Sequence, residues 1–81
     1  MDRETIAAAA RAVVAEMTGA EVDGDEPLIS SGRIDSLSIL KLITKLEQRL
    51  NIRMPTEKLQ PDDFETVDWI VDTVERTAEG L

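Results

Sequence analysis

The amino-acid sequence predicts an all-α fold, a bundle of three main helices with one additional short helix. Apolar residues recur at the helical period in three separate segments, and no segment shows the alternation of polar and apolar residues that indicates a β-strand. Most glycine and proline residues lie between these periodic segments. With 81 residues, the chain is expected to form a single domain over residues 1–81 with one hydrophobic core.

The first helix is expected over residues 2–18. Asp2 is a suitable N-cap, because its carboxylate can accept hydrogen bonds from free amides of the first turn. Gly19 lies where the helix would stop, since glycine readily adopts the left-handed conformation found at helix ends. At about 100° per residue, one face collects the apolar side chains of Ile6, Ala10, Val13, Val14 and Met17.

A long loop is expected over residues 19–35, where glycine, proline and serine replace the helical pattern. A connection of about 17 residues is longer than usual, and such loops are often functional or disordered. Four apolar residues favour an ordered loop that lies against the helices, namely Val22, Leu28, Ile29 and Ile34.

The second helix is expected to begin at Asp35 or Ser36 and to end near Leu50. A brief helical turn is expected over residues 61–64, and Thr66 is expected to cap the last helix. The apolar arc of the second helix comprises Ile39, Leu40, Leu42, Ile43, Leu46 and Leu50, and that of the last helix comprises Val67, Ile70, Val71 and Val74.

Cys and His are both absent from the sequence, which excludes several kinds of chemistry. The chain has no disulfide, no thiolate nucleophile, no Ser-His triad and none of the commonest metal ligands. Residues 23–26 are acidic, but they lack the remaining ligand spacing of a calcium loop. Neither an enzyme activity nor a metal site is therefore expected.

The net charge of −8 narrows the choice of partners. It argues against nucleic acid, whose phosphates need Lys and Arg, and against anionic membrane surfaces. No apolar run approaches the ~20 residues that span a bilayer, and the charged N-terminus lacks the apolar stretch of a signal peptide. We expect a cytoplasmic monomer whose charge keeps it in solution.

The tripeptide Asp35-Ser36-Leu37 lies where the long loop meets the second predicted helix. On its own it indicates only an ordinary helix N-cap. Its surroundings are more specific, because several short motifs occur at set distances from it. They are Pro27-Leu28-Ile29-Ser30-Ser31-Gly32-Arg33-Ile34 before the tripeptide, and Leu46-Glu47, Ile52-Arg53-Met54-Pro55 and Phe64-Glu65-Thr66-Val67 after it. In this combination, nearly the whole chain, from about residue 4 to residue 76, resembles the acyl carrier proteins.

This resemblance implies that Ser36 carries 4'-phosphopantetheine, attached from coenzyme A through a phosphodiester. The thiol of that arm would hold an acyl group as a thioester. The resemblance also implies that Asp35 assists the attachment, with Mg²⁺ in the transferase complex. Two features of the sequence agree: the chain has no thiol of its own, and it has no base to activate Ser36. An outside enzyme would therefore perform the attachment.

The function that the resemblance implies is that of a non-catalytic carrier for fatty-acid-like, polyketide or other specialised biosynthesis. Its partners would be a phosphopantetheinyl transferase, a loading enzyme and downstream transferases. The stretch from Gly32 to Ser36 has the apolar residue Ile34 directly before Asp35. In this respect it resembles the corresponding stretch of free-standing carriers of specialised pathways, which include D-alanyl carriers. Two alternatives remain: an aminoacyl or peptidyl carrier of the D-alanyl type, and an unmodified helical interaction module in which Ser36 is only an N-cap.

Leu37, Lys41 and Lys45 are the predicted partner contacts. On a helix that begins at Asp35 or Ser36, all three would lie on the exposed side. Residues 36–53 carry four cations against one anion, a sum of +3, whereas fatty-acid carriers usually show an acidic second helix. This charge indicates either a specialised partner or internal balance with neighbouring elements. The lone tryptophan, Trp69, is expected either to pack over a helix or loop, or to contact a partner.

Overall fold

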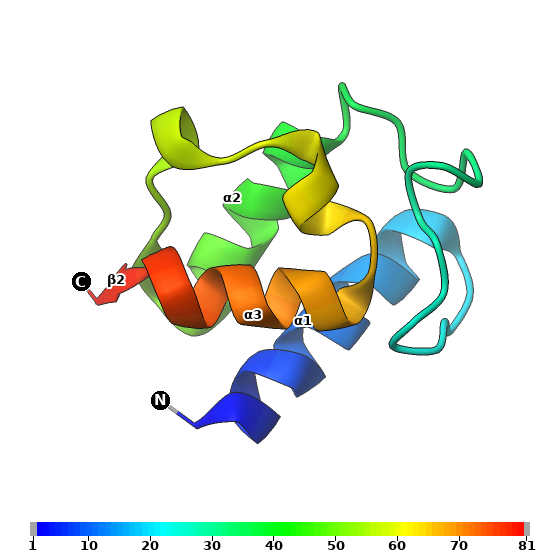
Figure 1. Ribbon diagram of the computed structural model, residues 1–81. Coiled ribbons are helices and arrows are strands. Elements are labelled where there is room, and N and C mark those ends of the chain that lie inside the picture. The colour runs from blue at the N-terminus through cyan, green and yellow to red at the C-terminus, as the bar shows by residue number, and fades with distance from the viewer. Residues whose placement is uncertain (1, 81) are drawn as a thin grey trace.

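The computed structural model describes residues 2–80, and helices dominate this part of the chain (Figure 1). The α-helices are α1 (Arg3–Thr18), α2 (Ile39–Leu50) and α3 (Val67–Thr77). Two 3-10 turns lie between α2 and α3, η1 (Thr56–Lys58) and η2 (Pro61–Phe64). The predicted fold of three main helices is confirmed, and the predicted short helix at residues 61–64 is present as a 3-10 turn rather than an α-helix.

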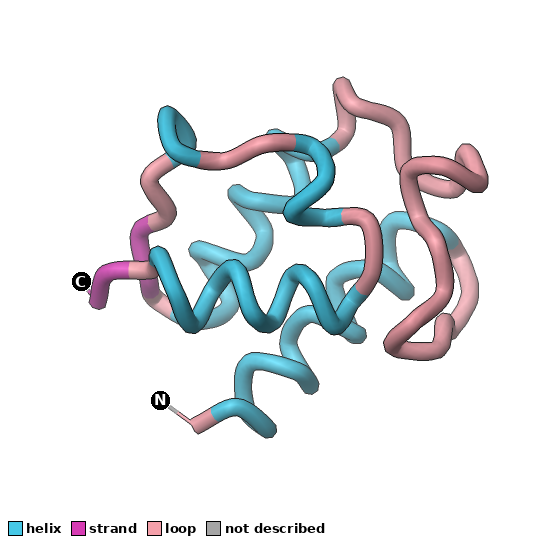
Figure 2. The backbone as a smooth tube through the Cα atoms, in the orientation of Figure 1, coloured by secondary structure: helices cyan, strands magenta, loops and turns pink. Residues whose placement is uncertain are grey.

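One small pairing of strands was not predicted. Strand β1 (Ile52–Arg53) pairs antiparallel with β2 (Glu79–Gly80), so that Ile52 lies opposite Gly80 (Figure 2). Two residues are too short for an alternating pattern to be recognised. The pair joins the end of α2 to the end of α3. None of the helices in residues 2–80 has the length and apolar character needed to cross a membrane.

Helix α1 begins and ends where its capping residues predict. The carboxylate of Asp2 accepts a hydrogen bond from the Thr5 amide at 2.8 Å, and the Gly19 amide donates to the Ala15 carbonyl at 2.8 Å. Gly19 has a φ of 79°, a left-handed conformation that glycine adopts without steric cost. The helix packs against both α2 and α3 through its buried face, which comprises Ile6, Ala9, Ala10, Val13 and Val14.

Helix α2 begins at Ile39, three or four residues later than predicted. The carboxylate of Asp35 accepts a hydrogen bond from the Ser38 amide at 2.8 Å, and the Asp35 carbonyl accepts from the same amide at 3.1 Å. These bonds close residues 36–38 into a separate turn. The first helical bond reaches back only to the Ser38 carbonyl. Asp35 therefore caps the turn before α2 and not α2 itself.

Leu40 was predicted to lie in the apolar arc of α2, and this prediction is wrong. Its side chain is 65% exposed, whereas Leu42 and Leu46 are fully buried. At 100° per residue, Leu40 lies about 100° from the centre of the buried side chains, at the edge of the arc. The buried face of α2 is thus narrower than its sequence indicates.

The core includes residues of the long loop as well as helical residues. Val22, Leu28 and Ile34 are buried, and Ile29 is partly buried, as predicted. The loop also lies against α3, because the Asp68 amide donates to the Gly24 carbonyl at 3.0 Å. The long loop is therefore ordered by buried side chains along its length.

Leu28 provides a test of this arrangement. Leu28→Ala should lower the free energy of unfolding by about 2–5 kcal/mol, because the substitution leaves a cavity in a fully packed site. The matched control Leu40→Ala should change it by no more than about 0.5 kcal/mol, since Leu40 is mostly exposed. Chemical denaturation measures both values, and equal losses would contradict the assignment of Leu28 to the core.

Candidate functional site

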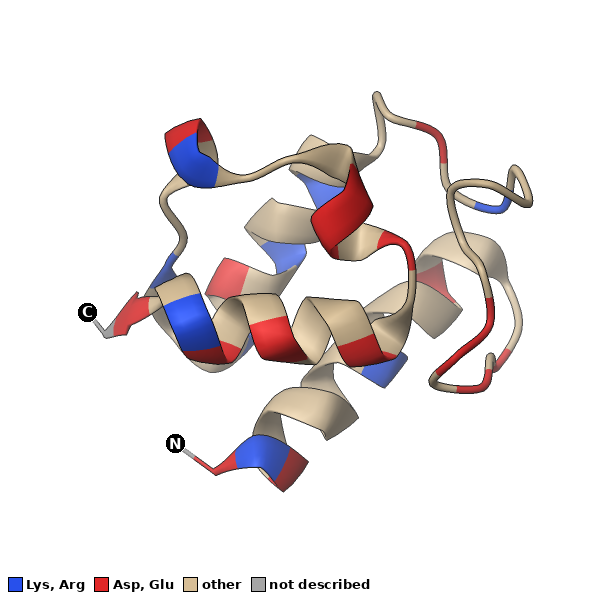
Figure 3. Cartoon of the chain, viewed as in Figure 1, with Lys and Arg blue, Asp and Glu red and all other residues tan. Residues whose placement is uncertain are grey.

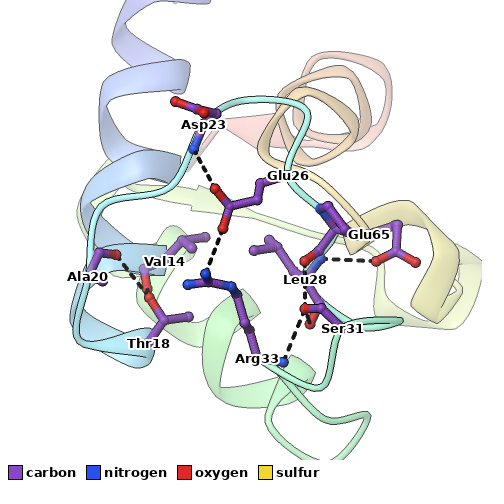
Figure 4. Close-up of polar contacts among 10 residues, drawn as sticks. Val14, Thr18, Ala20, Asp23, Glu26, Leu28, Ser31, Arg33 and Glu65 are labelled. Atoms are coloured by element: carbon purple, nitrogen blue, oxygen red, sulfur yellow. Dashed lines mark hydrogen bonds and ion pairs between the residues drawn. The ribbon is translucent and has the colours of Figure 1, made fainter.

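The candidate site lies at the junction of the long loop with α2, and the loop there is held by one carboxylate. Glu65, between η2 and α3, accepts hydrogen bonds through Oε1 from three consecutive backbone amides. The distances are 3.0 Å to the Leu28 nitrogen, 2.9 Å to Ile29 and 3.0 Å to Ser30. The Glu65 carbonyl also accepts from the Leu28 amide, at 2.7 Å (Figure 4). These bonds satisfy amides that no helix or strand satisfies.

Further bonds within the loop complete its shape (Figure 4). The Ile34 amide donates to the Leu28 carbonyl at 2.9 Å, which closes the loop just before Asp35. The Ser31 hydroxyl donates to the Pro27 carbonyl at 2.6 Å. Arg33 and Glu26 form an ion pair at 3.0 Å across the loop. The path of the chain into the site is therefore defined by backbone bonds and not only by apolar anchors.

Ser36 is exposed and begins the turn that leads into α2. Within residues 2–80, no hydrogen bond to protein engages its hydroxyl group. The neighbouring Asp35 carboxylate is instead held by the backbone of this turn. Hydrogen bonds from Ser38, with a smaller contribution from the Leu37 amide, hold the pKa of Asp35 below its usual value of 3.8. The site thus combines a free hydroxyl with an ionised carboxylate.

A phosphodiester on Ser36 is compatible with this geometry. The hydroxyl is accessible, and the Ser38 side chain makes no capping bond at the nearby start of α2 in the described chain. Free amides and the positive end of a helix dipole favour an anion. The Asp35 carboxylate opposes a second negative charge, so attachment would benefit from a cation supplied at that moment.

The predicted contact residues occupy different environments. Leu37 is 87% exposed, which confirms its predicted exposure, but it lies in the turn before α2 and not on the helix. Lys41 is exposed on α2, and no ion pair with it is found among the residues that the structure describes. Lys45 was predicted to lie on the exposed side, but it is partly buried, and its Nζ lies 3.5 Å from Oε1 of Glu16 in α1.

Some cations of α2 pair with an acidic residue of α1, and others remain exposed to solvent. Arg49 also pairs with Glu16, so two of the four cations in residues 36–53 serve the packing of α2 on α1. Acidic residues lie along α3 and the long loop (Figure 3). Internal balance explains part of the positive charge, and Lys41 is the exposed cation nearest to Ser36 in sequence on α2.

Trp69 lies on the outer face of α3 and is 53% exposed. Its amide donates to the Thr66 hydroxyl at 3.0 Å, so Thr66 caps α3 as predicted. About half of the residue is therefore accessible, and Trp69 is not buried beneath a helix or loop.

Glu65 is the residue of this site whose role the sequence does not indicate. It precedes a helix cap and has the pattern of an ordinary surface acid. Its bonding partners lie 35 to 37 residues away along the chain. Leu40 was also missed as an exposed apolar side chain, and only its position at the edge of the helical arc could have revealed it.

These features describe a small helical domain that presents one accessible serine beside an ordered loop. Residues 8–74 match the model of the family described as "Phosphopantetheine attachment site". The chain belongs to this family, whose members carry a 4'-phosphopantetheine prosthetic group. It is therefore a carrier domain of a class that is generally not itself catalytic.

Several curated relatives are similar over a shorter stretch. They are named "D-alanyl carrier protein" and come from Streptococcus pyogenes serotype M5 (strain Manfredo), serotype M49 (strain NZ131) and serotype M1. Each is 43% identical over 51 residues, which is 63% of this chain. The chain spans 65% of the length of these relatives, slightly less than two thirds.

The capping role of Asp35 predicts a pH dependence. Its carboxyl group should titrate below 3.8, because the hydrogen bonds from the Ser38 amide favour the ionised form. The stability that Asp35 contributes should be present above the pKa of the unfolded chain and disappear as the pH falls through the lower pKa of the folded chain. Carbon-detected NMR titration of Asp35 measures this pKa.

The variant Asp35→Asn is the control for this titration. The stability difference between the native chain and Asp35→Asn should be largest near neutral pH and should shrink as the pH falls below 3.8. A carboxyl that titrates at or above 3.8 would contradict the capping role.

Proposed function

We propose that residues 1–81 form one non-catalytic carrier domain and that Ser36 is its attachment site for 4'-phosphopantetheine. The observation that carries this proposal is the exposed, unbonded Ser36 hydroxyl at the end of an ordered loop, within the family match over residues 8–74. In the rival interpretation, a helical interaction module, Ser36 would be an N-cap. The structure favours the carrier, because Asp35 and not Ser36 supplies the capping bond.

The attachment is a transfer of the phosphopantetheinyl group of coenzyme A to the serine. The Ser36 oxygen forms a bond to the phosphorus of the pantetheine phosphate, and the diphosphate bond of coenzyme A breaks. The nucleotide part of coenzyme A leaves, and the serine proton passes to a base of the transferase, since this chain has no His or Cys. Asp35 is proposed to assist, because one oxygen binds the Ser38 amide and the other can meet a cation brought by the transferase.

We propose that Leu37 and Lys41 contact the partner enzymes, which are the transferase, a loading enzyme and downstream transferases. Both are exposed and lie close to Ser36 in sequence. An exposed leucine can fill an apolar pocket of a partner, and an exposed lysine can steer its approach. Lys45, the third predicted contact, would have to give up its ion pair with Glu16 to take part fully.

The cargo has two candidates. The sequence predicts an acyl group of a fatty-acid-like, polyketide or other specialised pathway. The names of the relatives favour an amino acid, D-alanine, held as the same kind of thioester. Incubating the modified protein with an acyl-activating or an amino-acid-activating loading enzyme, followed by intact mass analysis, distinguishes the two.

Ser36→Ala should abolish the attachment and leave the fold intact. Alanine removes the only atom that can form the phosphodiester, while Asp35 still caps the turn, so stability should change by no more than about 1 kcal/mol. Intact mass after incubation with coenzyme A and a phosphopantetheinyl transferase measures the gain of the arm.

The control for this experiment is Ser38→Ala, because the Ser38 side chain makes no capping bond in the described chain. Ser38→Ala should gain the arm as the native chain does. If Ser36→Ala still gained it, the assignment of the site would be wrong.

Two substitutions separate the apolar contact from the charged contact. Leu37→Ala should slow transfer between carrier and partner at every salt concentration, because it removes apolar contact area. Lys41→Glu should slow transfer mainly at low salt, because exposed charges act through a screened field. Neither should lower the melting temperature appreciably, since both residues are exposed.

The measurement is a salt series of transfer rates with the native loading enzyme. A Lys41→Glu chain that reacts at the native rate at low salt would show that Lys41 does not contribute to docking. A Leu37→Ala chain with native rates throughout would exclude Leu37 as a contact.

A further inference from the structure

The bonding of Glu65 is unusual for a partly exposed side chain. One carboxylate oxygen receives the amides of three consecutive residues, all within 3.0 Å. Successive amides that converge in this way form an anion-binding concavity, which is occupied here by a carboxylate of the same chain. Bonds to an ionised acceptor are stronger than those between neutral groups. They also hold the pKa of Glu65 below its usual value of 4.5, with the Ser30 amide as the largest cause.

Glu65 is itself held in place from both sides. The preceding residue, Phe64, is 1% exposed, and Val67, two residues later, is also 1% exposed. Between them Thr66 caps α3. The carboxylate therefore projects from a segment that is anchored in the core, so it can act as a fixed point for the loop.

Few residues separate the part of the loop that Glu65 binds from Ser36. The residue that Glu65 binds first, Leu28, also accepts the Ile34 amide at 2.9 Å. Only Asp35 separates Ile34 from Ser36, and Ile34 is buried. The place of Ser36 on the surface is thus linked to Glu65 through the Leu28 amide, the bond from the Ile34 amide to the Leu28 carbonyl, and the two residues that follow Ile34.

We propose that Glu65 is a positioning residue, which holds the loop over residues 28–34 in the conformation that presents Ser36 to the phosphopantetheinyl transferase. This inference rests on the proposed attachment at Ser36. Without the carboxylate, the amides of Ile29 and Ser30 lose their acceptor and the Leu28 amide keeps only the Glu65 carbonyl, so the loop opens to water beyond Leu28 while the helical core remains packed. Only the fraction of molecules with a closed loop is then recognised by the transferase.

The kinetic consequence differs from that of a general loss of stability. If only a fraction of the chain is competent to bind, the apparent affinity falls by that fraction. Glu65→Ala should therefore raise the KM of the transferase for the unmodified chain by about tenfold or more and leave kcat nearly unchanged. The KM for Glu65→Gln should lie between those of the native chain and Glu65→Ala, because the amide oxygen of glutamine still accepts hydrogen bonds.

The experiment uses the full unmodified chain, coenzyme A and one phosphopantetheinyl transferase, well below the melting temperature of each variant. The matched control is Glu57→Ala, which removes the same charge from an exposed residue of η1. Hydrogen exchange adds a second readout. In Glu65→Ala the amides of residues 29–30 should lose protection, while the Leu28 amide, which keeps the carbonyl of residue 65, and those of α1 and α2 should keep it.

A raised KM in Glu65→Ala, partial rescue in Glu65→Gln and a native KM in Glu57→Ala would support the proposal. A native KM in Glu65→Ala, or an equal rise in Glu57→Ala, would overturn it. If Glu65→Ala lost protection throughout the core, the Glu65→Gln variant would decide the matter. A native KM of the transferase for Glu65→Gln, although the loop amides of this variant had lost protection, would overturn the proposal. A native chain that the transferase leaves unmodified would instead overturn the proposed function itself.

Discussion

The carboxylate of Glu65 accepts hydrogen bonds from backbone amides of the long loop, which has no regular secondary structure. Residues 19–38 form neither helix nor strand, so their backbone amides have no regular partners. Unpaired buried amides are costly, and ordering such a segment also costs conformational entropy. Three charge-assisted bonds to Glu65, together with buried Leu28 and Ile34, offset these costs. The position of the candidate serine depends on this arrangement.

Helices α1 and α2 pack against each other and leave several side chains near Ser36 exposed. Helix α1 supplies small and branched side chains to the core, and its Glu16 pairs with Lys45 and Arg49 of α2. Surface ion pairs of this kind contribute little energy individually, but here they place two cations of α2 beside α1. The turn and first residues of α2 are left with exposed Leu37, Leu40 and Lys41. An apolar and weakly cationic surface thus adjoins Ser36.

The features that the sequence predicted correctly depend on local rules. Asp2, Gly19 and Thr66 mark helix ends because their capping bonds reach residues only three or four positions away. The features it missed depend on contacts between distant segments. Glu65 acts on a loop more than 30 residues away, and Lys45 is engaged by an acid on another helix. The late start of α2 was also missed: the Asp35 carboxylate and carbonyl close residues 36–38 into a separate turn through the Ser38 amide, and the first helical bond runs from the Leu42 amide to the Ser38 carbonyl.

The most direct test of the account is peptide-level mass spectrometry of the protein purified from its natural source. We expect the peptide that contains Ser36 to carry 4'-phosphopantetheine, and the mass of any group on its thiol to identify the cargo as an acyl or an aminoacyl group. Native protein in which the arm is found on a different residue, or in which the Ser36 peptide occurs only without an arm, would contradict it.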